Sequence, residues 1–387
     1  MSKRIKVARV STVPFFVVTQ LSAPIQALAD SGAEVVIVAS DDALGGNVSG
    51  LDCAEYVPIH IARDIDPLSD LRSLARLIKL FRERRFDIVH STTPKAGLLC
   101  AIAGCVSRVP VRLHSFTGQP WVTMTGLKRT ILKACDRIIG VLNTRCHTDS
   151  NSQRQFLINE KIIKPEKIAV LGEGSLAGVN LQRFNAQRYE QSEKASLKAD
   201  LGINEDSTVL LFVGRITKDK GVGELLDAFV SLVRKGKKVD LILVGPYESD
   251  GESIVSKYCS SPEIAARVKR TGFSDEPEKY MAVSNILCLP SYREGFGTVV
   301  IEAAAMGLPT VGTEIYGLTD AVVSNVTGTL VPVRDASALE NALGRLIDDP
   351  LLLETMAKAA NQRAVDSFDS MRYSQLLIDE YKSLLKS

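Results

Sequence analysis

The sequence predicts an α/β protein with two domains, each a doubly wound parallel sheet covered by helices. Its 387 residues exceed the usual size of a single domain. Strand-like apolar runs alternate with helical patterns along the whole chain, which favours parallel strands joined by crossover helices. The opening shows this order, with a strand at 5–10, a helix at 20–31 ended by Gly32, and a strand at 34–39.

The composition is that of a soluble globular protein, with 45% hydrophobic and 24% charged residues. The net charge of +2 does not call for nucleic acid, so we expect no such partner. No N-terminal signal peptide and no apolar stretch of ~18 residues is visible. The seven cysteines are an odd number without a Cys-x-x-Cys pair. We therefore expect reduced core cysteines in a cytoplasmic protein.

The charge is unevenly distributed. Residues 1–180 hold 23 Lys and Arg against 16 Asp and Glu, and the segment 71–137 holds 13 basic against 3 acidic residues. This excess suits an anionic membrane surface or a pyrophosphate-bearing acceptor. The run 121–137, which begins at Trp121, mixes apolar and basic positions. It fits a helix on anionic lipid or an ordinary core-packing helix equally well.

In the first half of the chain, candidate ligand-binding residues lie near the ends of predicted strands. The segment 11–16 is expected to be a loop, either an apolar lip for a lipid-linked acceptor or a packed turn. Amphipathic spacing predicts a helix over 68–84, and 138–142 reads as a strand. Asp64 and Asp66 have a metal-binding spacing but lie in a polar connector, so we expect no metal. Strand ends face the ligand crevice in such sheets, and the residues found near them here are Pro14, Phe15, His90, Lys95 and His114.

The second half repeats the pattern of a buried strand followed by a polar loop. A strand at 207–213 precedes Gly214, Arg215 and Lys220, and another run at 267–274 ends near Gly272 and Phe273. Both loops follow the carboxyl ends of predicted strands, where sheets of this kind bind their ligands.

The stretch 289–311 carries the clearest constellation. A strand ends at Pro290, a glycine-bounded loop carries Glu294, and a helix opens near Thr298 with Glu302 one turn inside. The first amides of that helix form an anion site between the two carboxylates. A phosphate there would have hydroxyl-binding groups on both sides, suited to a sugar and a ribose.

The Glu-x7-Glu spacing of Glu294 and Glu302 resembles the retaining glycosyltransferases of family 4, which have the GT-B fold of two Rossmann-like domains facing across a cleft. The resemblance implies that Glu294 binds donor-sugar hydroxyls, that Glu302 binds the ribose, and that His114 contacts the sugar near the reacting carbon. The catalytic residues it implies are His114, Arg215, Lys220 and Glu294. The donor-binding residues it implies are Gly214, Arg215, Lys220, Gly272, Phe273, Glu294, Gly295, Phe296, Gly297, Thr298 and Glu302. Pro14, Phe15, His90 and Lys95 are expected on the acceptor side.

The resemblance also implies domains at 1–183 and 184–369, with a C-terminal helix at 370–387 returning to the first domain. Many family members have a glycine pair in the first loop, where Pro14 and two phenylalanines stand here. This departure leaves the role of that loop open.

The expected function is transfer of a sugar from a nucleotide-diphosphate sugar, with retention of configuration, to an undecaprenyl-diphosphate-linked glycan of a capsule or O-antigen. We expect UDP-hexose or UDP-N-acetylhexosamine as donor, with GDP-mannose as second choice, and no metal or other cofactor. The enzyme is expected in the cytoplasm, peripheral on the anionic inner leaflet. A GT-B nucleotide-sugar 2-epimerase is the alternative. A non-catalytic sensor is disfavoured by the intact Glu294, Arg215 and Lys220.

Overall fold

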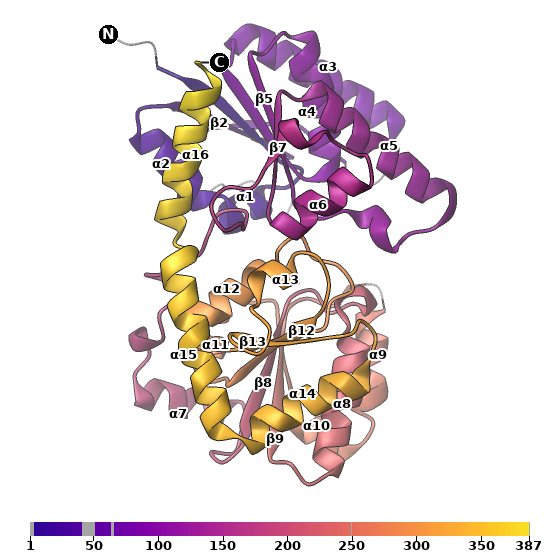
Figure 1. Cartoon of the computed structure of the whole chain (residues 1–387), viewed down its shortest axis with the longest axis vertical. Coiled ribbons are helices and arrows are strands. Elements are labelled where there is room, and N and C mark those ends of the chain that lie inside the picture. The colour runs from indigo at the N-terminus through magenta and orange to yellow at the C-terminus, as the bar shows by residue number, and fades with distance from the viewer. Residues whose placement is uncertain (1–3, 41–50, 63–65, 249, 387) are drawn as a thin grey trace. The chain divides into compact units, whose positions relative to one another are not determined.

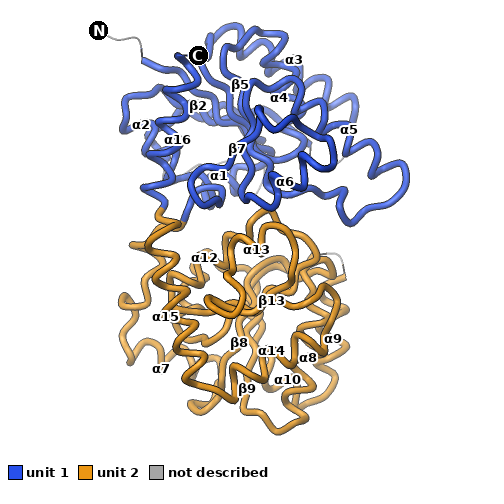
Figure 2. The backbone as a smooth tube through the Cα atoms, viewed as in Figure 1, with its two compact units in different colours: residues 1–178, 370–387 blue, residues 179–369 orange. Residues whose placement is uncertain are grey.

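A computed structural model describes residues 4–40, 51–62, 66–248 and 250–386. The chain divides into two compact units, unit 1 with residues 1–178 and 370–387, and unit 2 with residues 179–369 (Figure 2). Asp64 lies outside the described residues. Asp66 accepts a hydrogen bond from the Ser69 amide at 3.2 Å and so caps the following helix, which is an ordinary role for an aspartate before a helix.

Unit 1 is built on a seven-stranded parallel sheet with strand order β3-β2-β1-β4-β5-β6-β7. The order reverses between β1 and β4, which makes that point the topological switch of a doubly wound sheet. The strands are β1 (Lys6–Val10), β2 (Glu34–Ala39), β3 (Glu55–Pro58), β4 (Ile88–Thr92), β5 (Val111–Phe116), β6 (Arg145–Thr148) and β7 (Ile168–Ala169).

Helices cover both faces of this sheet (Figure 1). One face, which includes Val7 and Ile88, packs with α2 and α16, and the other, which includes Ala8 and Val89, packs with α3 and α4. Successive strand residues point to opposite faces, so near-continuous apolar strands serve both cores. The helices are α1 (Pro14–Gln20), α2 (Ser22–Asp30), α3 (Pro67–Arg84), α4 (Pro94–Val106), α5 (Gly126–Leu142), α6 (Asn151–Asn159) and α16 (Ser370–Leu384), with 3-10 turns at Pro120–Thr123 and Pro165–Lys167.

Two expectations for unit 1 are wrong. Residues 14–16 are the first turn of α1 rather than a loop, because Pro14 occupies the first helical position, where a missing amide costs nothing. Residues 138–142 continue α5 rather than forming a strand, and Ile139 and Gly140 are buried while Ile138 and Val141 face out. An apolar run of five residues does not distinguish a strand from the end of an amphipathic helix.

Unit 2 has a six-stranded parallel sheet with order β10-β9-β8-β11-β12-β13 and its switch between β8 and β11. The strands are β8 (Thr208–Val213), β9 (Val239–Val244), β10 (Val268–Gly272), β11 (Ile286–Leu289), β12 (Thr310–Thr313) and β13 (Gly328–Val331). The helices are α7 (Gln191–Asp200), α8 (Val222–Arg234), α9 (Gly251–Tyr258), α10 (Pro262–Arg267), α11 (Pro277–Ala282), α12 (Thr298–Ala305), α13 (Leu318–Ala321), α14 (Ala336–Asp348) and α15 (Pro350–Ser367), with 3-10 turns at Ala186–Arg188 and Lys218–Lys220.

The cysteines of the chain are all free thiols. Cys100, Cys146 and Cys288 are buried as expected, but Cys105 is exposed on α4, so the expectation of core positions is wrong for it. Across the described ranges, no helix is both long enough and apolar enough to span a bilayer.

Candidate active site

The loops after β8 and β11, at the switch point of unit 2, bring Lys220 and Glu294 together. Lys220 Nζ lies 2.5 Å from Glu294 Oε1, and the Ser291 hydroxyl donates to the same oxygen at 2.8 Å. Both charged side chains are mostly buried, with 18% and 14% exposed. A partly desolvated pair of this kind attracts more strongly than one in water. Two residues predicted from separate motifs therefore form one charged centre.

Backbone packing fixes the loop that carries Glu294. A Cβ atom at Gly317, where φ is +86°, would lie 2.6 Å from the Gly295 carbonyl oxygen, so only glycine fits against the loop. The Thr313 hydroxyl donates to the Ser291 carbonyl from the neighbouring strand. The loop is thus held from β12 and from the turn before α13.

Glycine also opens the helix that follows this loop. Gly297 precedes α12 in the left-handed region, with φ at +78°, and Thr298 is the first helical residue. The first turn of α12 contains no acidic residue. Its amides point out of the helix with partial positive charge, which suits a phosphate group.

Glu302 lies one turn inside α12 and is half-buried. Burial raises the pKa of its carboxyl group to about 7, although the positive charge of Arg183 acts in the opposite direction. Within the described residues, the structure gives its carboxylate neither a hydrogen bond nor an ion pair. A desolvated carboxylate of this kind is suited to accept hydrogen bonds from ligand hydroxyls.

Arg215 is more exposed than Lys220, with 46% of its side chain accessible, and it pairs with Glu248 at 2.6 Å. Exposed ion pairs of this kind contribute little free energy. Arg215 can therefore leave Glu248 for a more highly charged anion, such as a diphosphate, at little cost. Lys218 is exposed in the same loop.

The remaining donor-side predictions fall into two groups. Gly272 has φ at +72°, its carbonyl accepts from the Gly245 amide at 2.8 Å, and Phe273 is 58% exposed next to it. Phe296, in contrast, is 2% exposed and packs edge-on against Phe368, so its side chain belongs to the core.

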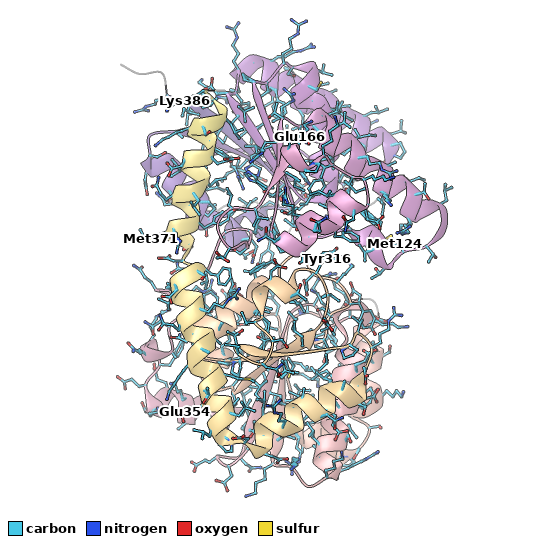
Figure 3. All side chains as sticks on the ribbon, viewed as in Figure 1. Met124, Glu166, Tyr316, Glu354, Met371 and Lys386 are labelled. Carbon is cyan, nitrogen blue, oxygen red and sulfur yellow. The ribbon has the colours of Figure 1, made fainter. Side chains whose placement is uncertain are left out.

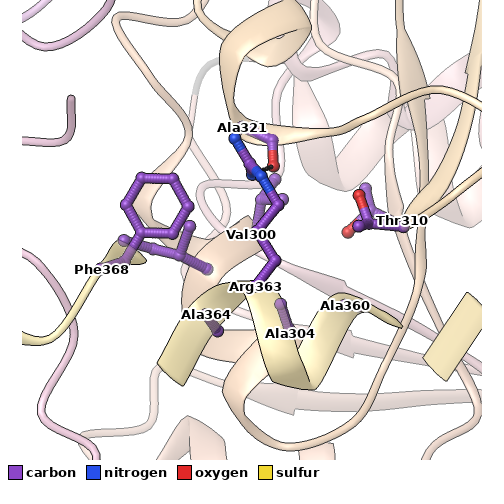
Figure 4. A pocket seen from close by; sticks show the side chains of 10 residues that line it. Val300, Ala304, Thr310, Ala321, Ala360, Arg363, Ala364 and Phe368 are labelled. Carbon is purple, nitrogen blue, oxygen red and sulfur yellow. Dashed lines mark hydrogen bonds between the residues drawn. The ribbon is translucent and has the colours of Figure 1, made fainter. Parts of the chain in front are cut away.

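Helix α15 packs against α12, and residues of both helices line a small cavity (Figure 4). Arg363 on α15 donates to the carbonyls of Asp320 and Ala321 at 2.7 and 2.6 Å, and Asn361 donates to the Ala305 carbonyl at 2.7 Å. The cavity between these helices measures only about 10 Å³, room for about one water molecule. It is therefore a packing defect rather than a ligand site.

In unit 1, His114 lies in β5 and is 1% exposed. Its Nδ1 atom faces the Ser91 hydroxyl at 3.0 Å, and burial lowers its pKa to about 3, so the imidazole is neutral at physiological pH. A Cβ atom on Gly97 of α4 would lie 2.4 Å from the ring, so glycine at that position lets α4 pass directly over His114.

His90 is 2% exposed and belongs to a polar network under α16. Its Nδ1 atom lies 2.5 Å from Arg9 Nη1 and 2.6 Å from the Tyr381 hydroxyl, and its Nε2 atom lies 2.8 Å from Ser115 Oγ. An arginine can only donate, so Nδ1 accepts and Nε2 carries the proton. No local pattern pointed to Arg9 or Tyr381, because the two residues are 372 positions apart in the chain.

The other acceptor-side candidates lie on α1 and at the start of α4, on segments that meet where the Thr12 and Thr93 hydroxyls are 2.7 Å apart. Pro14 is buried in α1, Phe15 is 51% exposed, and Lys95 Nζ pairs with Asp70 of α3 at 2.9 Å. Trp121 does not face outward, because it is 1% exposed and its indole donates to Asp136 at 2.7 Å. Among the residues that the structure describes, no group of three or more His, Cys, Asp or Glu could hold a metal ion.

Comparison with known proteins identifies the chain. It matches the family described as glycosyl transferases group 1 over residues 193–363 and the glycosyl transferase 4-like domain over residues 17–174. It is 33% identical over 94% of its length to the capsular polysaccharide biosynthesis glycosyltransferase CapM of Staphylococcus aureus, covering 93% of that protein. The chain belongs to the group 1 glycosyltransferases. The predicted family is confirmed.

Two further known proteins are similar to this glycosyltransferase. It is 26% identical to the Escherichia coli UDP-Gal:alpha-D-GlcNAc-diphosphoundecaprenol alpha-1,3-galactosyltransferase, over 85% of this chain and 83% of that one. Its fold matches Anabaena HepE in complex with UDP, with a TM-score of 0.79, 19% identity, and coverage of 98% of this chain and 100% of HepE. The glycosyltransferase thus has two Rossmann-like parallel-sheet domains and the GT-B fold, as predicted.

Proposed function

We propose that this glycosyltransferase moves a hexose or N-acetylhexosamine from a UDP-sugar to an undecaprenyl-diphosphate-linked glycan during surface polysaccharide synthesis. The E. coli relative carries UDP-Gal and a diphosphoundecaprenol acceptor in its name, and the S. aureus relative belongs to capsule synthesis. The observation that carries the proposal is the Lys220–Glu294 pair beside the N-terminus of α12. The cation suits a diphosphate, and the carboxylate suits sugar hydroxyls.

In the proposed donor site, Arg215 and Lys220 bind the diphosphate, and Gly214, Gly295, Gly297 and Thr298 line its path with backbone amides. Glu294 accepts from sugar hydroxyls and Glu302 from the ribose, while the backbone at Gly272 and Phe273 holds the base. The charge that develops on the leaving diphosphate meets two cations and a helix N-terminus. This supply of positive charge supports metal-independent transfer.

The proposed mechanism is front-face substitution with retention. The bond between the anomeric carbon and the leaving phosphate oxygen breaks as the acceptor oxygen bonds to the same face. The acceptor proton passes to the departing phosphate oxygen, whose charge Arg215 and Lys220 hold.

The proposed lipid partner is the anionic inner leaflet of the membrane. The exposed face of helix α5 supports this proposal. Four apolar side chains on one face, the α5 stripe, are exposed by 42% to 75%: Leu127, Ile131, Ile138 and Val141. Lys128 and Arg137 are exposed beside the stripe, and Met124 lies just before α5 (Figure 3). A groove of about 560 Å³ at the end of α5 adds three cations, Lys161, Lys164 and Lys167. Apolar side chains flanked by cations suit an interfacial helix.

A transfer assay tests the enzymatic proposal. UDP-hexoses, UDP-N-acetylhexosamines and GDP-mannose are incubated in EDTA, with and without a lipid-diphosphate-linked sugar, and products are identified by mass spectrometry and NMR. Transfer from a UDP-sugar with an α-linked product is expected. Transfer from GDP-mannose alone would favour the second donor, and an epimer formed without acceptor would favour an epimerase, a reaction that the relatives named above do not support. Inactivity in EDTA contradicts metal independence.

Vesicle sedimentation tests the lipid partner separately. We expect the protein to pellet with phosphatidylglycerol vesicles at low salt but not with phosphatidylcholine vesicles. Ile131→Glu should abolish pelleting, whereas Leu351→Glu, at a position 73% exposed on α15, should leave it unchanged. If the unaltered protein stays in the supernatant, the membrane proposal fails while the transfer chemistry stands.

A further inference from the structure

Two ion pairs lie next to each other between the loop after β8 and the loop after β11. Arg293 Nη2 donates to Asp219 Oδ2 at 3.1 Å, and Lys220 Nζ lies 2.5 Å from Glu294 Oε1. Two consecutive residues of one loop thus pair with two consecutive residues of the other, and the order of charges is reversed between the loops. The opposite pairing, of Asp219 with Glu294 and of Lys220 with Arg293, would bring like charges together.

The backbone joins the same two loops beside the ion pairs. The Tyr292 amide donates to the Asp219 carbonyl at 2.9 Å. A Cβ atom at Gly221 would lie 2.0 Å from the Pro290 carbonyl oxygen, so glycine permits the close approach of the loops at this point. The two loops therefore contact each other through their backbones as well as through their side chains.

The carboxylate of Asp219 is oriented by its own loop. The Thr217 hydroxyl donates to Oδ1, and Oδ2 accepts from Arg293. Burial raises the pKa of Asp219, but the Thr217 hydroxyl and the positive charge of Arg293 outweigh this effect and hold the pKa below its ordinary value. Asp219 is therefore a carboxylate at neutral pH. With 31% and 27% of the two side chains exposed, its pair with Arg293 is stronger than a fully solvated pair.

Donor binding acts differently on the two ion pairs. In the proposed donor complex, Lys220 contacts the diphosphate and Glu294 contacts sugar hydroxyls, so their attraction to each other is shared with the ligand. We propose that Asp219 and Arg293 are positioning residues of the donor site: their ion pair, the loop clasp, holds the Lys220 loop against the Glu294 loop with and without donor. The inference rests on the proposed donor roles of Lys220 and Glu294.

The physical effect of the loop clasp is pre-organisation. A diphosphate that contacts Lys220 on one loop and the first amides of α12, which follows the other loop, requires both loops in place. Without the clasp, the loops separate more freely in the free protein, and binding must order them at a cost in conformational entropy. This cost weakens binding more than it slows the bound enzyme, because the bound donor itself holds both loops.

Calorimetry with UDP on the full chain tests this. Asp219→Asn and Arg293→Gln should each raise the Kd for UDP by about 10-fold. The double variant should bind as each single variant does, because the two residues act through one contact. Arg293→Lys keeps the positive charge and should retain much of the affinity. Asp206→Asn, which breaks an exposed ion pair with Lys238 elsewhere in unit 2, is the matched control and should leave the Kd unchanged.

Hydrogen exchange and steady-state kinetics separate positioning from a general loss of structure. In Asp219→Asn without UDP, exchange should become faster in segments 217–221 and 290–295, and saturating UDP should restore their protection. The KM for a UDP-sugar donor should rise, with kcat changed by less than about 3-fold. A merely structural role would instead speed exchange throughout unit 2 and lower kcat at an unchanged KM.

The outcomes also distinguish this inference from the proposed donor site. An unchanged Kd for UDP in Asp219→Asn, or additive effects of Asp219→Asn and Arg293→Gln, would overturn the inference and leave the donor site in place. If the unaltered protein does not bind UDP, the proposed donor site fails and the inference fails with it.

Discussion

The two sheets have the same parallel, doubly wound design but use their polar residues in opposite ways. At the unit 2 switch point, charged side chains stand on loops after the strands and form ion pairs, as Lys220 and Glu294 do. In unit 1, His90 and His114 lie inside strands, are almost fully buried, and have lowered pKa values. Position on the loop or in the strand thus decides whether a polar group acts as a charge or as a fixed neutral hydrogen-bonding group.

The largest expected effect is the loss of the unit 2 ion pair. Lys220→Met should reduce kcat by ~100- to 1,000-fold, because a cation on the leaving diphosphate acts mainly in the transition state. Single-turnover rates at saturating donor measure this. Lys218→Met, two residues away and exposed, is the control. Near-normal turnover of Lys220→Met would remove Lys220 from the proposed site and weaken the contrast between the units.

The next effect concerns acid stability, where the units should respond with opposite signs. Burial lowers the pKa of both His90 and His114, so the unfolded chain binds protons that the folded unit does not. Below pH 6.5, His90, His114 and the similarly buried His147 should make unit 1 less stable. The raised pKa values of Asp149 and Asp136 in the same unit should offset part of this loss. Hydrogen exchange at pH 7.5 and 5.5 measures this by segment. Equal loss of protection in both units would contradict the contrast.

Unit 2 supplies the opposite sign through Glu302. Burial raises the pKa of Glu302 to about 7 in the folded protein, above the ordinary value of 4.5 that it has in the unfolded chain. The folded state therefore binds this proton more tightly, and the stability that results is lost as the pH rises from 4.5 to about 7. Glu302→Gln should therefore stabilise the protein by on the order of 2 kcal/mol at pH 8 and much less at pH 5. Urea denaturation measures this, with Glu263→Gln on the surface of α10 as control. A destabilised variant at pH 8 would show that the carboxylate is better solvated than its burial indicates.

The smallest effect is expected for the polar network under α16. Tyr381→Phe removes the hydroxyl that contacts both Arg9 and His90 and should cost about 1 kcal/mol, measured by urea denaturation. Tyr280→Phe, on α11 in unit 2, is the comparison. An unchanged free energy of unfolding would mean that the hydroxyl is replaced by water and that α16 is held by apolar packing alone.

Many residues of the candidate donor site could be predicted from the sequence, because the motifs that carry them are short and lie within single loops. Glycines, cations and glutamates in short loops after apolar strands gave the candidate residues around Lys220, Glu294 and Glu302, and alternating strands and helices gave the doubly wound fold. The expectations about secondary structure that failed involved short apolar runs: residues 138–142 continue α5, and Pro14 begins a helix. Local pattern alone cannot distinguish these alternatives, since the same residues satisfy either structure until their neighbours are known.

By itself, the sequence determined the order of elements, the parallel sheets and the charged loops, because spacing and residue type act over a few positions. Only the tertiary structure decided which of these groups are charges. It brought Lys220 to Glu294 across 74 positions and Arg9 to Tyr381 across 372. It also buried His114 and Glu302 enough to move their pKa values in opposite directions. Desolvation depends on what packs around a side chain, and that is a property of the fold rather than of any short segment.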